Sequence, residues 1–149
     1  MSARQWVFRL MNGVHPWLYR RAGGKGMVAQ VQGMPLLLLT TTGRRSGKAR
    51  TSVLGYLRDG DDLLVIGSAG GEPHHPAWAL NLRTNPEAEV QVGTDRFRVR
   101  GEWTGREARD RLWQRLITEY PFYAPYQAKA HRTIPIIRLR RVSAPTAAP

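Results

Sequence analysis

Four cations lie in one short, glycine-punctuated segment of the sequence, and they are Arg44, Arg45, Lys48 and Arg50. A hydrogen bond from a charged donor contributes roughly 1.5–3 kcal/mol, so these side chains would bind an anion strongly if they converged. A Walker A nucleotide loop is excluded, because three residues rather than four separate Gly43 from Gly47 and Ala49 follows the lysine. The alternative interpretation is a solvated hairpin tip.

A second unusual segment places three tyrosines at intervals of three residues. Tyr120, Tyr123 and Tyr126 are separated by prolines at 121 and 125, which exclude one continuous helix. The segment is typical either of an aromatic wall with hydroxyl donors over a flat ligand or of a loop that packs its tyrosines on the core. Both interpretations stay open from the residues alone.

The composition excludes several kinds of self-sufficient catalysis. The chain has no cysteine, which removes thiolate metal sites, iron–sulfur clusters and cysteine nucleophiles. It contains no G-x-S-x-G nucleophile motif, and its four histidines share no spacing typical of a metal site, so no metal is expected. If the protein is an enzyme, a bound cofactor is expected to perform the difficult step.

The charge of the chain is concentrated in its first part. The 149 residues include 23 Lys and Arg against 11 Asp and Glu, which gives a formal net charge of +12. Positions 1–58 contain ten of the cations and no acid, so the remainder is nearly balanced. This distribution predicts an anionic partner, and nucleic acid, an anionic lipid surface and a polyanionic small molecule all qualify.

Strands must position most of these residues. Apolar, β-branched or alternating runs bounded by Gly, Asp, Asn and Pro predict strands near 36–42, 51–57, 63–68, 90–92, 97–103 and 133–142. About six strands in so short a chain predict a mainly antiparallel β-barrel with flanking helices rather than a doubly wound sheet. Pro135 indicates that the last strand lies at an edge or begins near this residue.

Helices are predicted around this barrel. An apolar residue at every fourth position predicts a helix over 105–119, with Thr104 and Glu107 as a capping box. A proline near the first turn predicts a short helix over about 76–82. We expect an N-terminal helical segment over 1–30, the barrel domain over 31–142 and a disordered tail over 143–149.

The N-terminal segment alternates cations with aromatic residues. Over positions 1–22, Trp6, Leu10 and Val14 would lie along one side of a basic helix, which is typical of a helix on an anionic membrane surface or of a helix packed on the barrel. No membrane span is predicted, because no apolar run approaches about 18 residues, and no signal peptide is predicted, because the first residues lack a continuous apolar region and a small-residue cleavage site. We therefore expect a cytoplasmic protein, either free or in peripheral contact with the inner face of the cell membrane.

Seven stretches occur in a specific order within about 34–142, and they are 37–50, 56–61, 68 with 70–71, 75–78, 81–82 with 85–86, 120–127 and 132–135. Together they resemble the deazaflavin (F420)-dependent nitroreductase and F420H2-dependent quinone reductase family of actinobacteria. The first of these stretches includes the cation-rich segment, and the sixth includes the three tyrosines. Each stretch alone is a weak signal, whereas their combined order is specific.

The resemblance implies a split β-barrel like that of FMN-binding proteins. It implies binding of coenzyme F420, a deazaflavin with a phosphate and a polyglutamate tail, and hydride transfer to a quinone or nitroaromatic acceptor. The implied cofactor-binding residues are Arg45 and Arg50 at the phosphate, Arg44 and Lys48 at the tail, Ser68, Gly70 and Gly71 along the deazaflavin, and Trp78 and Asn81 in support. The implied acceptor residues are Tyr120, Tyr123 and Tyr126, and the implied catalytic group is Tyr123, Tyr126 and Ser68.

Three positions depart from the family pattern. Ala69 and Ala79 replace residues that are often Lys and Tyr, and Gly55 replaces a substrate-side Tyr of some relatives, so a roomier acceptor pocket is expected. Nitroimidazole reduction is not implied. An F420-dependent reductase is expected to bind no nucleic acid. Two alternatives stay open: a basic barrel that binds nucleic acid, and a split barrel that binds FMN or haem. A monomer and a homodimer are both compatible with the sequence.

Overall fold

The computed structural model of the protein describes residues 20, 30–31 and 33–142. Its strands are β1 (Gln30–Val31), β2 (Met34–Thr42), β3 (Ala49–Asp59), β4 (Asp62–Ile66), β5 (Glu87–Val92), β6 (Asp95–Trp103) and β7 (Ile136–Arg141). Its helices are α3 (Ala77–Thr84), α4 (Arg106–Glu119) and α5 (Ala124–Ala130), with short 3-10 helices η2 (Ala69–Gly71) and η3 (Pro121–Tyr123). The expectations for 1–30 and 143–149 lie outside the described residues, apart from Arg20 and Gln30.

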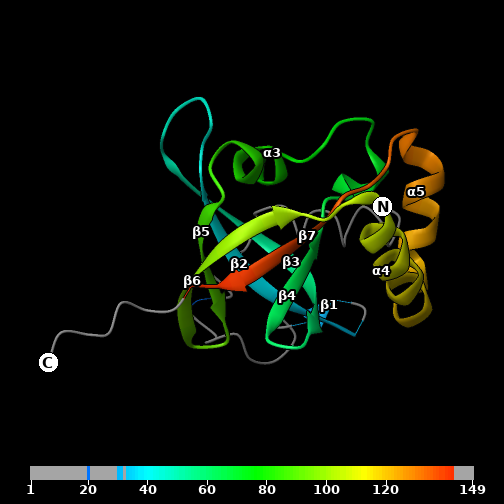
Figure 1. The fold of residues 1–149 in the computed structure, drawn as a ribbon, viewed down its shortest axis with the longest axis horizontal. Helices are drawn as coiled ribbons and strands as arrows, with labels where there is room; N and C mark the ends of the chain where they lie inside the picture. The colour runs from blue at the N-terminus through cyan, green and yellow to red at the C-terminus, as the bar shows by residue number, and fades with distance from the viewer. Residues whose placement is uncertain (1–19, 21–29, 32, 143–149) are drawn as a thin grey trace, which may run out of the picture.

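Six of these strands form a closed antiparallel barrel at the centre of Figure 1. The hydrogen-bonded order is β2-β3-β4-β7-β6-β5, and pairing of β2 with β5 closes the sheet on itself. Helix α3 lies over one end of the barrel, and α4 and α5 lie together at its side. The structure confirms the predicted barrel of about six antiparallel strands with flanking helices.

The wall of the barrel separates two apolar cores. The first includes Leu37, Leu39 and Val65. The second is formed with the helices at the side and includes Leu64 and Leu116. Because adjacent residues of a strand point to opposite faces, Leu64 and Val65 contribute to different cores. Continuous apolar runs therefore mark the strands that are covered on both faces.

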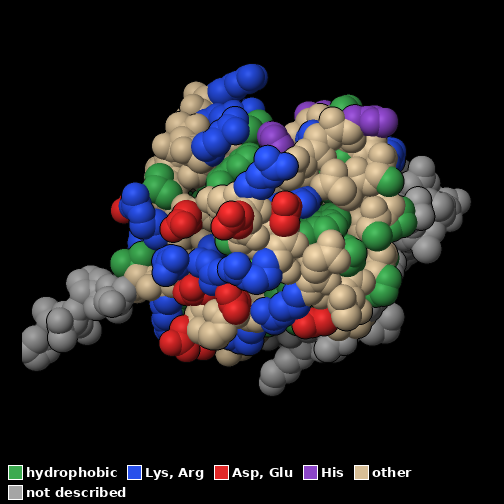
Figure 2. All heavy atoms as spheres, turned by 45° about the vertical axis from the view of Figure 1, so that its right-hand side comes forward, with side chains coloured by type: hydrophobic (Ala, Val, Ile, Leu, Met, Phe, Trp, Pro, Cys, Tyr) green, Lys and Arg blue, Asp and Glu red, His purple; other side chains and the backbone are tan. Residues whose placement is uncertain are grey.

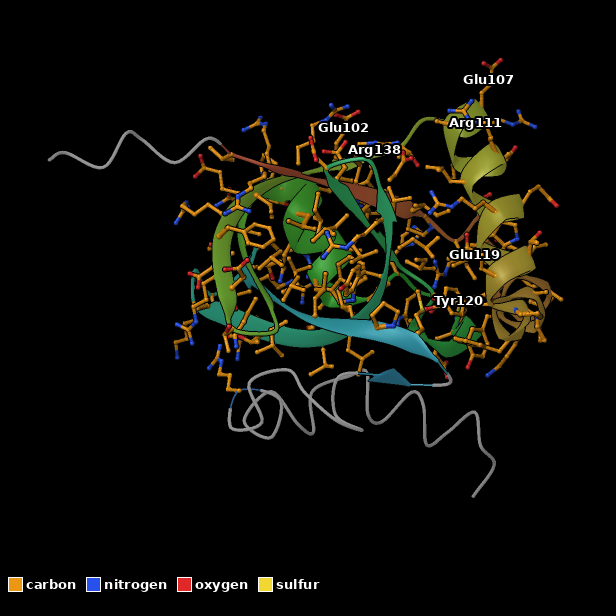
Figure 3. All side chains as sticks on the ribbon, turned by 90° about the horizontal axis from the view of Figure 1, so that it is seen from below. Glu102, Glu107, Arg111, Glu119, Tyr120 and Arg138 are labelled. Atoms are coloured by element: carbon orange, nitrogen blue, oxygen red, sulfur yellow. The ribbon has the colours of Figure 1, made fainter. Side chains whose placement is uncertain are left out.

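Helix α4 confirms the helix predicted over 105–119, but its N-terminus differs from the prediction. The predicted capping box is wrong, because Gly105 is the N-cap residue and no side chain caps it. Thr104 instead donates its hydroxyl to the carbonyl of Ile136 at 2.7 Å, which ties the start of α4 to β7. Glu107 points away from the barrel at this end of the helix (Figure 3). A tertiary contact has replaced the local cap.

Prolines mark the remaining boundaries. Pro121 begins η3, and α5 follows directly with Pro125 in its first turn; the sequence predicted the break but not this second helix. Strand β7 begins directly after Pro135 and lies between β4 and β6, so this proline marks a strand start and not an edge. Pro76 is the N-cap residue of α3, which confirms the short helix predicted near 76–82.

Candidate functional site

The cation-rich segment forms the tip of the β2–β3 hairpin, which extends beyond the barrel in Figure 1. The N–H of Gly43 donates to the carbonyl of Lys48, and the N–H of Gly47 donates to the carbonyl of Gly43, each at 2.8 Å. Gly47 has a φ of 71°, a conformation that favours glycine. A Cβ at Gly43 would lie 2.7 Å from the hydroxyl oxygen of Ser46. The glycines therefore set the shape of the tip.

Helix α3 holds this hairpin through one buried side chain. The Oδ1 atom of Asn81 accepts hydrogen bonds from the backbone N–H and the Nη1 of Arg44, at 3.1 and 3.2 Å. The side-chain nitrogen of Asn81 donates to the hydroxyl of Thr41 at 3.1 Å. The structure thus brings Arg44 and Asn81 together, and part of the Arg44 side chain serves to fix the hairpin.

A cleft of about 370 Å³ opens between the hairpin and α3. The residues predicted for the cofactor that line it are Arg44, Arg45, Arg50, Trp78 and Asn81. Lys48 shares the hairpin but is not among the lining residues. Within the described part of the chain, the side chains of Arg45 and Arg50 have no hydrogen-bond or ion-pair partner. The cleft therefore presents two exposed guanidinium groups that have no counter-ion in the described part of the chain, which is an arrangement that binds anions.

The residues predicted for the deazaflavin lie in a tight turn after β4. Ala69, Gly70 and Gly71 have φ values of 47°, 63° and 82°, a region that residues other than glycine rarely adopt. The N–H of Gly71 donates to the carbonyl of Ser68 at 2.8 Å. The N–H groups of Ala69 and Gly70 donate to no acceptor among the described residues. The turn thus offers two N–H donors that no described residue uses, on a strained backbone, as ligand sites often do.

This turn also lies against α5. A Cβ at Gly71 would lie 3.1 Å from the carbonyl oxygen of Tyr126 and 3.2 Å from the Cδ of Lys129, so the close approach requires glycine. Ser68 is buried, and neither it nor the two glycines of the turn line the hairpin cleft. Residues 72–76 connect the turn to α3, the helix that carries Trp78.

Two of the three tyrosines are buried in the second core. Tyr123 is fully buried and donates its hydroxyl to the Sδ of Met34 at 3.4 Å; Tyr126 is 5% exposed. Burial, followed by the proximity of Tyr126 and Tyr120, raises the pKa of the Tyr123 phenol above its ordinary range. Tyr120 is half-buried. These positions favour the interpretation that the segment packs on the core, and contact of its tyrosines with an acceptor stays a prediction.

The room expected beside Gly55 is filled. A Cβ at this position would lie 2.5 Å from the Sδ of Met34, whose side chain is itself buried. Met34 therefore occupies the space in front of Gly55 and also receives the hydrogen bond of Tyr123. The expectation of a roomier pocket is wrong at this position, because a side chain from a neighbouring strand replaces the missing one.

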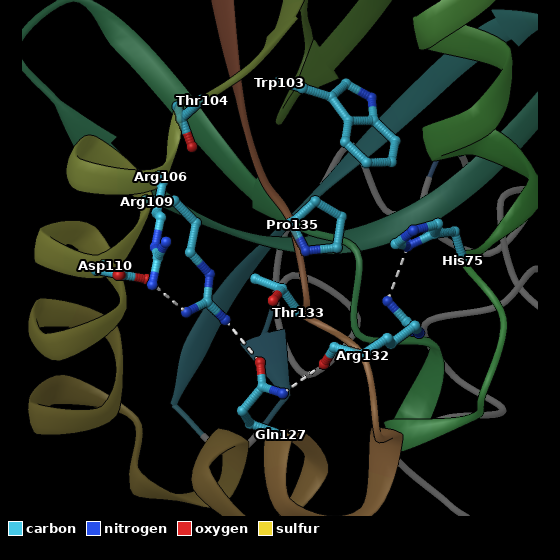
Figure 4. Close-up of a pocket in the computed structure, with 10 residues that line it drawn as sticks. All are labelled: His75, Trp103, Thr104, Arg106, Arg109, Asp110, Gln127, Arg132, Thr133 and Pro135. Carbon is cyan, nitrogen blue, oxygen red and sulfur yellow. Dashed lines mark hydrogen bonds and ion pairs between the residues drawn. The ribbon is translucent and has the colours of Figure 1, made fainter.

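A second pocket, of about 640 Å³, is lined by residues to which the sequence assigned no binding or catalytic role, although His75, Gln127 and Arg132 lie in stretches that carry the family resemblance (Figure 4). Arg132 donates to the Nδ1 of His75 at 2.9 Å, and Arg109 donates to the Oε1 of Gln127 at 2.6 Å. Burial, followed by the charges of Arg132 and Arg83, lowers the pKa of His75. Arg132 and His75 are 57 residues apart in the sequence, so no local motif could indicate their contact.

Comparisons with known proteins agree with one another. A family model described as F420H(2)-dependent quinone reductase matches residues 11–141. An F420H(2)-dependent quinone reductase of Mycobacterium tuberculosis is 38% identical over 133 residues, which cover 86% of this chain and 88% of the relative. A solved F420-H2 dependent reductase is 34% identical with a TM-score of 0.64, and the match covers 71% of this chain and 94% of that one.

A second solved structure, described as a domain-swapped dimer, is 30% identical with a TM-score of 0.66. The match covers 93% of this chain and 100% of that one. The fold shared with the solved reductase confirms the predicted split β-barrel.

Proposed function

Because the chain belongs to the F420H(2)-dependent quinone reductase family, we propose that it transfers a hydride from reduced coenzyme F420 to a quinone. The observation that carries this proposal is the cleft between the hairpin and α3, where Arg45 and Arg50 have no counter-ion among the described residues. A cofactor with a phosphate and several carboxylates supplies the anions that such a cleft requires.

The donors of the cleft fit these anions. A guanidinium group matches phosphate and carboxylate oxygens in a planar, two-point geometry. We assign Arg45 and Arg50 to the phosphate, and Arg44 and Lys48 to the carboxylates of the tail. Arg44 donates one hydrogen bond through Nη1 to Asn81 and retains other side-chain N–H groups for a ligand.

The turn at 68–71 is assigned to the deazaflavin. The N–H groups of Ala69 and Gly70 are suited to donate to ring carbonyl oxygens, and glycine at 70 and 71 lets the backbone approach a flat ring. Trp78, which is 4% exposed and lines the hairpin cleft, is assigned to supporting the cofactor from α3. Hydride transfer is the chemistry that the bound cofactor supplies. The protein contributes by holding the two rings in position and by excluding water.

Tyr123, Tyr126 and Ser68 are assigned to catalysis. The Tyr123 phenol is protonated at neutral pH, and burial raises its pKa further, so its hydroxyl can donate to an acceptor oxygen that gains charge. This hydroxyl donates to Met34 in the structure, so its use on an acceptor requires exchange of that contact. Tyr120 is assigned to the acceptor side behind the other two tyrosines.

The acceptor class follows from the name of the relatives, which is quinone reductase. Nitroaromatic compounds are a second class with similarly flat, electron-poor rings. The domain-swapped dimer among the structural relatives favours a homodimer over a monomer. Peripheral membrane contact through 1–22 concerns residues that, except for Arg20, lie outside those described. No helix within the described residues is long and apolar enough to cross a bilayer.

Fluorescence titration of the purified protein with coenzyme F420, in parallel with FMN and a DNA duplex, tests the proposal. We expect F420 to bind most tightly and the loaded protein to reduce a quinone with F420H2. Tyr123→Phe should lower quinone turnover and leave the Kd for F420 unchanged. Binding of FMN or DNA without binding of F420 would overturn the proposal in favour of one of the two alternatives.

A further inference from the structure

One arginine outside the hairpin uses every donor that it has. From the segment before β7, Arg132 donates through Nε to the carbonyl of Glu72 at 3.0 Å, and through Nη1 and Nη2 to the carbonyl of Gly67 at 3.2 Å. Nη2 also donates to the carbonyl of Ser68 at 3.0 Å, and Nη1 donates to the Nδ1 of His75 at 2.9 Å (Figure 4). An arginine has five N–H donors, so this one has none left for a ligand.

The carbonyl acceptors lie on both sides of the strained turn. The carbonyls of Gly67 and Ser68 come directly before η2 (Ala69–Gly71), and the carbonyl of Glu72 comes directly after it. Two backbone hydrogen bonds, of 2.8 and 3.1 Å, close the turn itself, while Ala69 holds a φ of 47° without being a glycine. A backbone in such a conformation persists only where its surroundings impose it. Arg132 joins the two ends of the turn and is placed to impose this conformation.

The same guanidinium group connects the turn to α3. His75, which accepts from Arg132, packs edge-on against Trp103 with ring centroids 5.1 Å apart. The Nε1 of Trp103 donates to the carbonyl of Ala79 at 3.1 Å, and Ala79 belongs to the helix that carries Asn81. One series of contacts therefore runs from Arg132 to the helix that holds the cation-rich hairpin.

We propose that Arg132 is a positioning residue for cofactor binding, which fixes the turn at 68–71 so that the N–H groups of Ala69 and Gly70 face the deazaflavin. This inference rests on the proposed function. Lysine cannot replace Arg132, because an ammonium group has three donors on one atom and cannot hold both ends of the turn. If only about a tenth of the molecules keep the competent turn, the apparent Kd rises about tenfold.

The test compares Arg132→Lys with Arg138→Met. Arg138 is a matched control because its side chain is also mostly buried, at 15% exposed, but it contacts Asp59 and Asp62 instead of the turn. Two quantities are measured: the Kd for F420 by fluorescence titration, and amide hydrogen exchange at Gly71 and Glu72 in the protein without cofactor. We expect Arg132→Lys to raise the Kd about tenfold and to speed this exchange, and Arg138→Met to lower the unfolding midpoint without either effect.

Chemical rescue separates positioning from a general loss of stability. Arg132 lines the second pocket, so Arg132→Ala leaves a space that a guanidinium ion can enter from solvent. Guanidinium chloride, far below concentrations that unfold the protein, is expected to restore F420 binding to Arg132→Ala. Sodium chloride at the same ionic strength is expected to restore nothing, because it provides no planar set of donors.

The possible outcomes distinguish failure of the positioning role of Arg132 from failure of the proposed function. Wild-type Kd and wild-type exchange in a folded Arg132→Lys protein would overturn the positioning role and leave the proposed function intact. If Arg132→Lys does not fold, failure of guanidinium to rescue Arg132→Ala overturns the inference. Failure of the wild-type protein to bind F420 overturns the proposed function and this inference with it.

Discussion

Arginines lie both in the cation-rich hairpin and on the outer wall of the barrel, by which we mean the charged side chains of Asp59 and of strands β4 to β7. The two groups of arginines differ in whether their charge is paired with an acid. Among the described residues, four ion pairs join strands of this wall: Arg98–Glu87 at 4.0 Å, Arg140–Glu102 at 3.7 Å, Arg138–Asp59 at 2.9 Å and Arg138–Asp62 at 3.0 Å. On the hairpin, Arg45 and Arg50 have no partner among the described residues. On the face shown in Figure 2, Lys and Arg side chains lie next to Asp and Glu.

The difference shows that the position of the acids decides which arginines are available to a ligand. All 11 acids follow position 58 in the sequence, after the hairpin has been completed. In the described residues they neutralise part of the wall and leave the hairpin cleft without a carboxylate. Because several wall arginines are paired with acids, the net charge of +12 is larger than the number of cations that are available to a polyanion such as nucleic acid.

The largest expected effect tests the hairpin. The double variant Arg45→Gln with Arg50→Gln removes two charged donors that contribute roughly 1.5–3 kcal/mol each. We therefore expect the Kd for coenzyme F420 to rise by about two orders of magnitude or more, measured by fluorescence titration. The unfolding midpoint should stay the same, because neither side chain has a partner among the described residues.

The control for this variant removes two charges from the wall instead. Arg98→Gln with Arg140→Gln also takes the net charge from +12 to +10, since two cations are lost, but neither residue lines the cleft. Exposed charges are screened beyond about 8 Å at physiological salt, so the Kd should change by less than about twofold. An equal loss of affinity in both double variants would mean that net charge, and not the hairpin, attracts the cofactor.

Within the wall, Arg138 is expected to contribute most to stability. Its mostly buried side chain contacts two carboxylates. Among the described residues, Arg138→Met leaves Asp62 without an ion pair and Asp59 with Arg115 alone. We expect the free energy of unfolding to fall by about 2–3 kcal/mol. Thermal unfolding should show a midpoint lower by about 5–10 °C. An unchanged midpoint would place Arg138 with the exposed pairs that stabilise little.

The strands of the barrel could be predicted because apolar runs report burial directly. The run at 36–39 is buried throughout in β2, as a strand covered on both faces must be. Closure through the β2–β5 pairing could not be predicted, because no local pattern specifies which distant strand will pair. Thr104 shows the same limit on a smaller scale, since its hydroxyl suited a local cap but bonds to Ile136 in β7.

The residues of the candidate site also differ in whether the sequence could predict them. The hairpin cations were predictable because they are neighbours in the sequence and a hairpin tip keeps neighbours together. The role of Arg132 was not, because its acceptors lie 57 to 65 residues earlier; the stretch 132–135 supported the family resemblance but did not indicate what this arginine contacts. The burial of Tyr123 likewise depends on Met34, which is 89 residues away.

His75, which accepts a hydrogen bond from Arg132, makes the stability of the folded protein depend on pH. Burial, followed by the charges of Arg132 and Arg83, lowers its pKa below the ordinary value of 6.5. The unfolded chain therefore takes up this proton at a higher pH than the folded protein. The free energy of unfolding falls as the pH drops below about 6.5 and stops falling below the folded pKa. For one proton the slope is at most about 1.4 kcal/mol per pH unit.

Urea unfolding between about pH 5 and pH 8 measures this effect. His75→Gln keeps a side-chain oxygen that can accept from Arg132 but does not titrate, so it should lose this part of the acid sensitivity. His74→Gln changes an exposed neighbour and should keep the wild-type profile. A His75→Gln profile parallel to that of the wild type would contradict the assigned effect of His75.

The smallest expected effect concerns the exposed pairs of the wall. Arg98 and Glu87 are both 64% exposed and lie 4.0 Å apart, so their pairing should contribute less than about 0.5 kcal/mol. Arg98→Gln should therefore change the free energy of urea unfolding no more than Arg100→Gln, whose arginine lies on the same strand without an ion pair among the described residues. A loss above about 1 kcal/mol for Arg98→Gln alone would show that the acids stabilise the wall. Equal, small losses would mean that these acids neutralise the charge of wall arginines without stabilising the fold. Neutralised arginines are less available to anions, so the hairpin would be the favoured place for an anion to bind.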